Sequence, residues 1–84
     1  MALQPNSQKR LDVITIGRCS VDLYGQQIGS RLEDVTSFAK SVGGCPSNIA
    51  IGTARLGLKS GLITRVGDEQ MGRYVREQMA REGV

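Results

Sequence analysis

The sequence predicts an α/β fold with a parallel βαβ core, and three features of the chain support this class. Short runs rich in β-branched residues cover residues 11–17 and 60–67. Between them, residues 46–56 place apolar side chains at helical spacing, and a second helical pattern follows residue 68. Because parallel strands need a long crossover, usually a helix, the two runs are expected to pair in parallel through a right-handed connection.

The first predicted strand covers residues 11–17 and is rich in valine and isoleucine. Its nearly continuous apolar character is typical of a parallel strand that is buried on both faces. Asp22 follows shortly afterwards, and ligands of open α/β sheets bind beyond the carboxyl ends of the strands. Asp22 is therefore a candidate acceptor for the hydroxyl groups of a ligand, and a turn or capping aspartate is the alternative.

Residues 24–42 show weak and mixed periodicity, interrupted by Gly25 and Gly29. Residues 35–42 are a candidate extended strand, with Phe38 as their aromatic side chain. The pattern is consistent with a small β element at the surface, and a hairpin without any motion is the simplest interpretation of it.

Residues 43–50 read GGCPSNIA and form the predicted junction between extended chain and a helix over residues 46–56. Glycines allow positive φ and a close approach of the backbone to a ligand, and Pro46 suits a first helical turn. Asn48 offers a donor and an acceptor, and the free N–H groups of a helix start favour oxygen ligands. The octapeptide predicts the floor of a pocket for a polyhydroxylated small molecule, and a plain loop-to-helix turn is the alternative.

Glycines and one aspartate mark the other predicted helix ends. Gly57 is the expected stop of the first helix, and Gly52 in its interior is expected at a close-packing position against the sheet. Asp68 is expected to cap the second helix, and Gly83 to end it. Val84 is then the expected first residue of a further strand. The apolar face of the second helix is formed by Met71, Tyr74, Val75, Gln78 and Met79.

Composition narrows the class of function. At 84 residues, the chain has room for one small domain or part of one. The net charge is +3, but basic and acidic residues alternate, which indicates solvated surface rather than a nucleic-acid site. Cys19 and Cys45, with no histidine, match neither a zinc site nor a redox pair and exclude a Ser-His or Cys-His arrangement within the chain. With no apolar run of membrane-spanning length, we expect a cytoplasmic, reduced protein with a small-molecule ligand and no membrane or nucleic-acid partner.

The order of these motifs resembles one known family. The pattern Gly-Gly-x-Pro-x-Asn-x-Ala in residues 43–50, followed by Gly57 and Gly67, is similar to the amino-terminal signature of the ribokinase-like, or phosphofructokinase-B, carbohydrate kinases. Residues 16–25 (IGRCSVDLYG) and 31–35 (RLEDV) are most similar to the members that phosphorylate the sugar acid 5-dehydro-2-deoxygluconate in inositol catabolism.

The resemblance assigns roles to individual residues. The residues that it implies bind the sugar are Asp22, Gly43, Gly44 and Asn48. If the ligand is a sugar acid, charge and position, and not the resemblance, make Arg18, Arg31 and Lys40 the candidate contacts for its carboxylate. Ser20 stands where some relatives have an asparagine, and Arg65 is a further basic residue that could reach the pocket or remain solvated.

The resemblance also implies the architecture. The fold is ribokinase-like, with a small β lid at about residues 24–42 that covers the sugar, excludes water and often pairs with a second subunit. Residues 11–84 would be the N-terminal part of a kinase domain that is truncated on its C-terminal side, after a disordered leader over residues 1–10. The catalytic base, in a Gly-x-Gly-Asp segment, and the site for ATP with its Mg²⁺ are expected outside these residues. The 84-residue chain alone is therefore expected to be inactive and marginally stable.

Other functions remain open at this point. Another sugar kinase of the family, acting on fructose, ribose or 2-keto-3-deoxygluconate, would share the same pocket signature. A truncated module that binds sugar or pairs through its lid, without chemistry, is a second alternative. A dinucleotide-binding oxidoreductase is disfavoured because no Gly-x-Gly-x-x-Gly pattern follows the first predicted strand.

Overall fold

The computed structural model describes residues 10–84 and confirms a mixed α/β fold. In chain order the elements are β1 (Val13–Ile16), β2 (Ser20–Gly25), a short 3-10 helix (Leu32–Asp34), β3 (Phe38–Gly43), α1 (Cys45–Arg55), β4 (Ser60–Ile63) and α2 (Gln70–Arg81). Strands β1 and β4 pair in parallel, with Val13 opposite Ser60 and Ile16 opposite Ile63, as the sequence predicts. The leader predicted for residues 1–10 lies, except for Arg10, outside the described residues.

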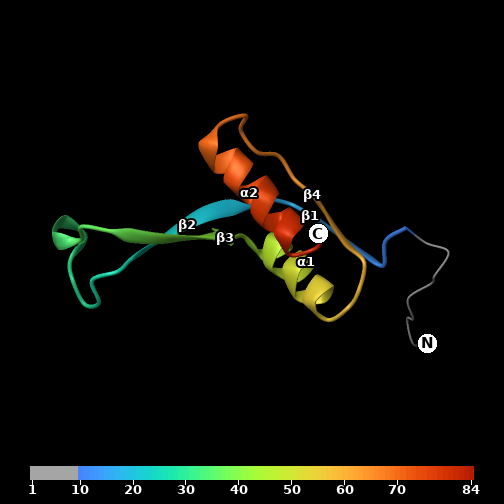
Figure 1. Cartoon of the computed structure of the whole chain (residues 1–84), viewed down its shortest axis with the longest axis horizontal. Helices are drawn as coiled ribbons and strands as arrows, with labels where there is room; N and C mark the ends of the chain where they lie inside the picture. Colours follow the sequence, from blue (N-terminus) through green and yellow to red (C-terminus); the bar gives the residue numbers. More distant parts are fainter. Residues whose placement is uncertain (1–9) are drawn as a thin grey trace.

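Strands β2 and β3 form a separate antiparallel hairpin, which projects away from the two α-helices (Figure 1). The radius of gyration is 15.8 Å, whereas a compact domain of this length would have about 12 Å. The principal extents of 52 × 29 × 19 Å reflect this projection. The hairpin is therefore the part of the fold that could cover a ligand bound near its base.

Strand β2 was not expected. The sequence predicts Asp22 just past the carboxyl end of the first strand, whereas Asp22 lies inside β2 and pairs with Ser41 of β3. Serine, aspartate and glycine are poor strand formers, which hides the alternation of apolar Val21 and Leu23 with polar neighbours. The predicted extended segment at residues 35–42 corresponds to β3, which begins three residues later, at Phe38.

Helix α1 begins and ends one residue before the predicted bounds of 46–56. Gly44 is its N-cap, with φ of 97°, and Pro46 occupies its first turn. At the other end, Gly57 has φ of 94° and donates its N–H to Ala54, while the next residue bonds to Thr53, which is the Schellman pattern. The close-packing role expected for Gly52 is wrong, because a Cβ at this position would meet nothing within 4 Å.

Helix α2 is capped one residue later than predicted. Asp68 is not the cap; the side chain of Glu69 accepts hydrogen bonds from the backbone N–H groups of Met71 (2.9 Å) and Gly72 (2.8 Å). The longer glutamate reaches these donors because its own backbone is extended, with φ of −157°. At the C-terminal end, Gly83 has φ of 83°, as expected, and the N–H of Val84 donates to the carbonyl of Met79. The strand expected to begin at Val84 stays a prediction.

The core lies between the two helices and the bases of both sheets. Its buried apolar residues are Ala50, Val75 and Met79. The partly buried residues packed against them are Cys19, Val21, Val42, Ile51, Leu62, Val66 and Val84. The burial of both faces expected for the first strand is wrong for this chain: Ile14 is 54% and Ile16 72% exposed, because α1 covers only one face of β1 and β4.

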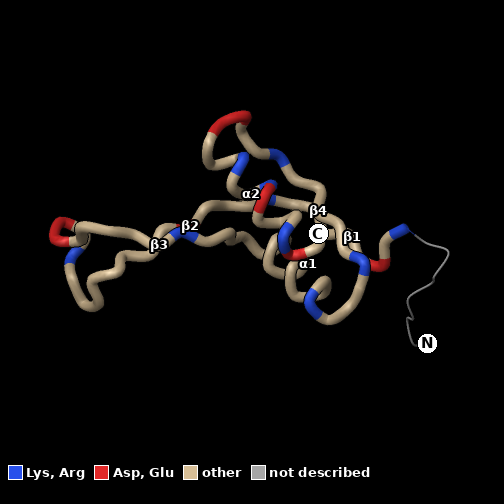
Figure 2. The backbone as a smooth tube through the Cα atoms, viewed as in Figure 1, with Lys and Arg blue, Asp and Glu red and all other residues tan. Residues whose placement is uncertain are grey.

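Charged residues do not gather on one face of the described chain. Basic and acidic side chains are interspersed along the backbone, including the tip of the hairpin (Figure 2). Within residues 10–84, no helix is long and apolar enough to cross a membrane.

Candidate functional site

The predicted sugar contacts meet where the hairpin joins the start of α1. Gly43 ends β3, Gly44 caps α1, and Asp22 projects from the neighbouring strand β2 toward Gly43. A Cβ at Gly43 would lie 2.6 Å from Cγ of Asp22 and 2.7 Å from its Oδ1. A glycine at this position therefore lets the carboxylate lie directly against the backbone.

Gly44 brings the start of α1 against the segment that follows β1. Its φ of 97° suits glycine, and a Cβ there would lie 2.7 Å from the carbonyl oxygen of Arg18. The carboxyl end of β1 and the N-terminus of α1 are thus held together at this point.

The Asp22 carboxylate is held in place by neighbours on its own strand. The hydroxyl of Ser20 donates to Oδ1 at 2.8 Å, and the hydroxyl of Tyr24 approaches Oδ2 at 3.5 Å. All three side chains share one face of β2 because residues two apart in a strand point the same way. The carboxylate is half-buried and keeps acceptor capacity for a ligand hydroxyl.

The first turn of α1 supplies the other polar groups. The backbone N–H of Asn48 bonds to the carbonyl of Gly44 at 3.0 Å, so the N–H groups that precede it have no carbonyl partner within the helix. The side chain of Asn48 is exposed. Ser47, which the sequence analysis did not single out, is fully buried, and its Oγ has no hydrogen-bond partner among residues 10–84.

The three candidate carboxylate contacts lie in different places. Arg31 is beside the 3-10 helix at the hairpin tip and pairs with Asp34, with 3.0 Å between Nε and Oδ2. Lys40 lies opposite Leu23 in the hairpin register, on the face away from Asp22, with its Nζ 4.7 Å from the centre of the Tyr74 ring. Arg18 alone of the three adjoins Gly44, through its backbone carbonyl.

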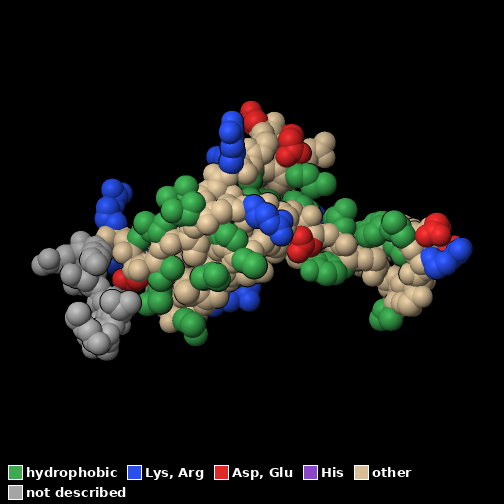
Figure 3. Space-filling view, turned by 180° about the vertical axis from the view of Figure 1, so that it is seen from behind, with side chains coloured by type: hydrophobic (Ala, Val, Ile, Leu, Met, Phe, Trp, Pro, Cys, Tyr) green, Lys and Arg blue, Asp and Glu red, His purple; other side chains and the backbone are tan. Residues whose placement is uncertain are grey.

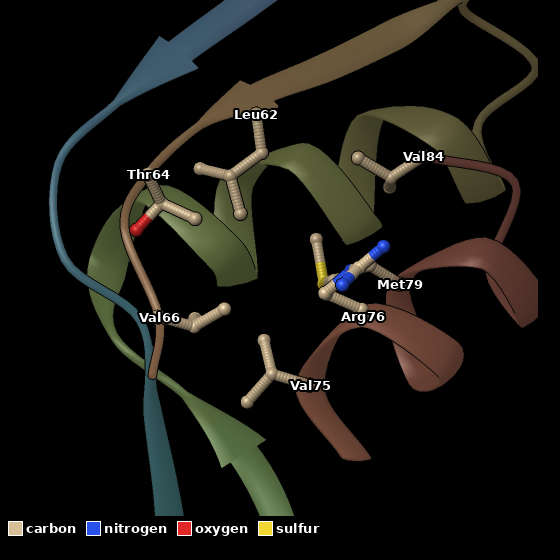
Figure 4. Close-up of a pocket in the computed structure, with 7 residues that line it drawn as sticks. All are labelled: Leu62, Thr64, Val66, Val75, Arg76, Met79 and Val84. Atoms are coloured by element: carbon tan, nitrogen blue, oxygen red, sulfur yellow. The ribbon is translucent and has the colours of Figure 1, made fainter. Parts of the chain in front are cut away.

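A separate apolar cavity of about 370 Å³ opens between β4 and α2 (Figure 4). Its lining consists of Leu62, Thr64, Val66, Val75, Arg76, Met79 and Val84. None of the predicted sugar contacts lines this cavity. A smaller cavity of about 230 Å³ brings Arg65 to the same space as Ser20 and Cys19. Within residues 10–84, no three acidic, cysteine or histidine side chains converge as a metal site would require.

Comparison with known proteins assigns the family. A family model described as pfkB family carbohydrate kinase matches residues 10–84. This chain belongs to that family. The ribokinase-like fold is confirmed by a PfkB protein from Polaromonas sp. JS666, which has a TM-score of 0.82 and 45% identity over 87% of this chain and 24% of its own.

Two further relatives are more specific in name. The 5-dehydro-2-deoxygluconokinase of Geobacillus thermodenitrificans is 47% identical over 79 residues, which is 94% of this chain and 23% of the relative. An uncharacterized sugar kinase from Pyrococcus horikoshii, solved in complex with ATP, has a TM-score of 0.79 and 42% identity over 86% of this chain and 24% of its own. The chain therefore spans about a quarter of the length of the relatives that it matches, and the resemblance stated from the motifs is confirmed.

Proposed function

We propose that the protein containing this chain transfers the γ-phosphoryl group of ATP to a hydroxyl of a sugar acid, and that residues 10–84 bind the sugar. The observation that supports this most directly is the Asp22 carboxylate, oriented by Ser20 and lying against Gly43 at the start of α1. Because the chain belongs to a carbohydrate kinase family, the ligand that donates hydrogen bonds to Asp22 is proposed to be a sugar.

The favoured substrate is 5-dehydro-2-deoxy-D-gluconate, phosphorylated at its terminal hydroxyl in inositol catabolism. Its support is the identity of 47% to a curated kinase named for that acid. A kinase of the same family acting on fructose, ribose or 2-keto-3-deoxygluconate is the alternative.

The proposed roles follow from hydrogen-bond chemistry. Asp22 accepts from sugar hydroxyls, since an ionised carboxylate offers only acceptors. Asn48 completes the network as donor and acceptor, and Gly43 and Gly44 let the backbone approach the sugar closely. These groups position the substrate, and positioning can lower a barrier by several kcal/mol. No catalytic base is proposed within this chain.

The nucleotide is proposed to bind elsewhere than in residues 10–84. One solved relative holds ATP, and Mg²⁺ is expected to accompany it by bridging phosphates. The described residues do not fit a magnesium site, because no three acidic side chains converge there. The free thiols of Cys19 and Cys45 support a reduced, cytoplasmic location.

The hairpin is proposed as a lid, at about residues 24–42, and as a contact to a second copy of the protein. It exposes large apolar side chains that a monomer would normally cover, which Figure 3 shows along the projecting arm. Those exposed by more than half are Leu23, Tyr24, Ile28 and Leu32. The same exposure supports the alternative of a non-catalytic module that binds sugar or pairs through its lid.

Phosphoryl transfer tests the proposal. ADP release with ATP and Mg²⁺ is measured with 5-dehydro-2-deoxygluconate, 2-keto-3-deoxygluconate, fructose and ribose. Two proteins are compared: the 84-residue chain, and the product of its reading frame where that frame continues past Val84. Preference of the longer product for 5-dehydro-2-deoxygluconate supports the proposal. Turnover by the 84-residue chain alone would show that a catalytic base lies within it, contrary to the proposal. Inactivity toward all four sugars contradicts the assignment of the pocket.

A further inference from the structure

Arg18 lies between β1 and β2, and its backbone adjoins Gly44 of the candidate sugar site. Cys19 and Val21 both pack against the buried core, whereas Ser20 and Asp22 are bonded to each other on the opposite face. Arg18 lies two residues before β2, in the segment that joins β1 to β2. Its carbonyl lies against Gly44, the N-cap of α1, which places the Arg18 backbone beside the candidate sugar contacts.

The charge of Arg18 is available to a ligand. Its side chain is exposed and forms no ion pair within residues 10–84, whereas the charge of Arg31 is shared with Glu33 and Asp34. Lys40 is held over the ring of Tyr74 on the other face of the hairpin. The structure therefore separates three basic residues that the sequence left equivalent.

A sugar acid needs a cation at this site. Asp22 carries a negative charge, and a substrate carboxylate in the same small site would be repelled unless a positive group lay near its other end. A guanidinium group suits that task because its planar fork can pair with both oxygens of a carboxylate. A neutral sugar could accept a hydrogen bond from such a group but would gain no charge pairing.

We propose that Arg18 binds the carboxylate of the sugar acid and so sets the preference for acids over neutral sugars. This assignment rests on the proposed function. Asp22 and Asn48 recognise hydroxyl groups that acids and neutral sugars share, and Arg18 recognises the group that distinguishes them.

The test compares two ligands and four variants in the protein made from its whole reading frame. The ligands are 5-dehydro-2-deoxygluconate and the analogue in which its carboxylate is reduced to a hydroxymethyl group. The variants are Arg18→Met, the two rival candidates Arg31→Met and Lys40→Met, and the matched control Arg81→Met at the end of α2. Dissociation constants are measured by calorimetry at low and high salt, with thermal melts to verify folding.

The expected result is a selective loss. Arg18→Met weakens binding of the acid about 10- to 100-fold and binding of the neutral analogue less than about 3-fold, as loss of one charge-assisted pair predicts. The acid affinity of the unsubstituted protein falls with salt more steeply than that of Arg18→Met. A selective loss in Arg31→Met or Lys40→Met instead, or equal losses for both ligands in Arg18→Met, overturns the assignment. If the unsubstituted protein binds neither ligand, the proposed function fails as well.

Discussion

Replacement of Gly43 by alanine tests whether the Asp22 carboxylate binds the sugar. A Cβ at residue 43 would lie 2.6 Å from Cγ of Asp22 and closer still to its Oδ2, whereas ordinary contact begins at 3.4 Å, so the carboxylate must move by more than about 0.8 Å. Such a shift also breaks the 2.8 Å hydrogen bond from Ser20. Since a misplacement of about 1 Å can cost about 100-fold, we expect sugar binding to weaken about 10- to 100-fold.

The assay is calorimetric titration with the sugar acid, beside a thermal melt of the same sample. The matched control is Gly52→Ala, which adds the same methyl group inside α1, where it meets nothing within 4 Å. This control should keep its affinity and gain about 1 kcal/mol of stability, because alanine is the better helix former.

A double variant isolates the mechanism. In an Asp22→Ala background there is no carboxylate to displace, so adding Gly43→Ala should cost little further affinity. If the Gly43→Ala protein is folded and binds the sugar within about 2-fold of the unsubstituted protein, then Asp22 does not bind it as proposed. Additive losses in the double variant would also refute the reasoning, because they would require two independent effects.

Three further changes probe the site and the fold. Asn48→Ala should weaken sugar binding about 10-fold in the same titration, through the loss of one or two hydrogen bonds of about 1 kcal/mol each. Because Asn48 is exposed, the melting temperature of the protein should not fall. Met79→Ala should cost about 2 to 5 kcal/mol in urea unfolding, since Met79 is 6% exposed, whereas Met71→Ala on the same helix, at 49% exposed, should cost far less. Backbone N–H groups that donate to the Glu69 carboxylate lower its pKa. The stability that this cap contributes to the protein is therefore fully present above the unfolded-state pKa of Glu69 and is lost as pH falls through its folded-state pKa. Urea unfolding should therefore show Glu69→Gln less stable than the unsubstituted protein at pH 7 and equal to it at about pH 2, and a difference that does not depend on pH would contradict the cap.

Most of the fold could be predicted because its signals are local. The glycines at residues 57 and 83 end their helices with positive φ, and the parallel pairing of β1 with β4 follows from the apolar runs. Strand β2 could not be found in this way, because its stability depends on pairing with β3 across the hairpin rather than on its own composition. The cap of α2 was missed for a related reason: an acidic pair precedes the helix, and only the backbone conformation decides which carboxylate reaches the free N–H groups.

The site itself was only partly visible in the sequence. Residues 43–50 predict the glycine turn and the start of α1. The hydrogen-bond partners of Asp22, however, depend on β2, which the sequence does not predict. In the sequence, Ser20 stands only where some relatives have an asparagine, whereas in the structure its hydroxyl donates to the Asp22 carboxylate. The placement of Lys40 on the face away from Asp22 also requires the hairpin register, which fixes the face of each side chain in β2 and β3.

Strand β2 carries two tasks on its two faces. Within β2, Val21 packs against the core residues of α1 and α2, while Ser20 and Asp22 face the candidate sugar site. Because successive side chains in extended chain point to opposite faces, a shift of one residue in the β2–β3 register would bury the carboxylate and expose the valine. The contact of Val21 with the core therefore fixes the β2–β3 register, and this register in turn orients Asp22 toward the candidate sugar site.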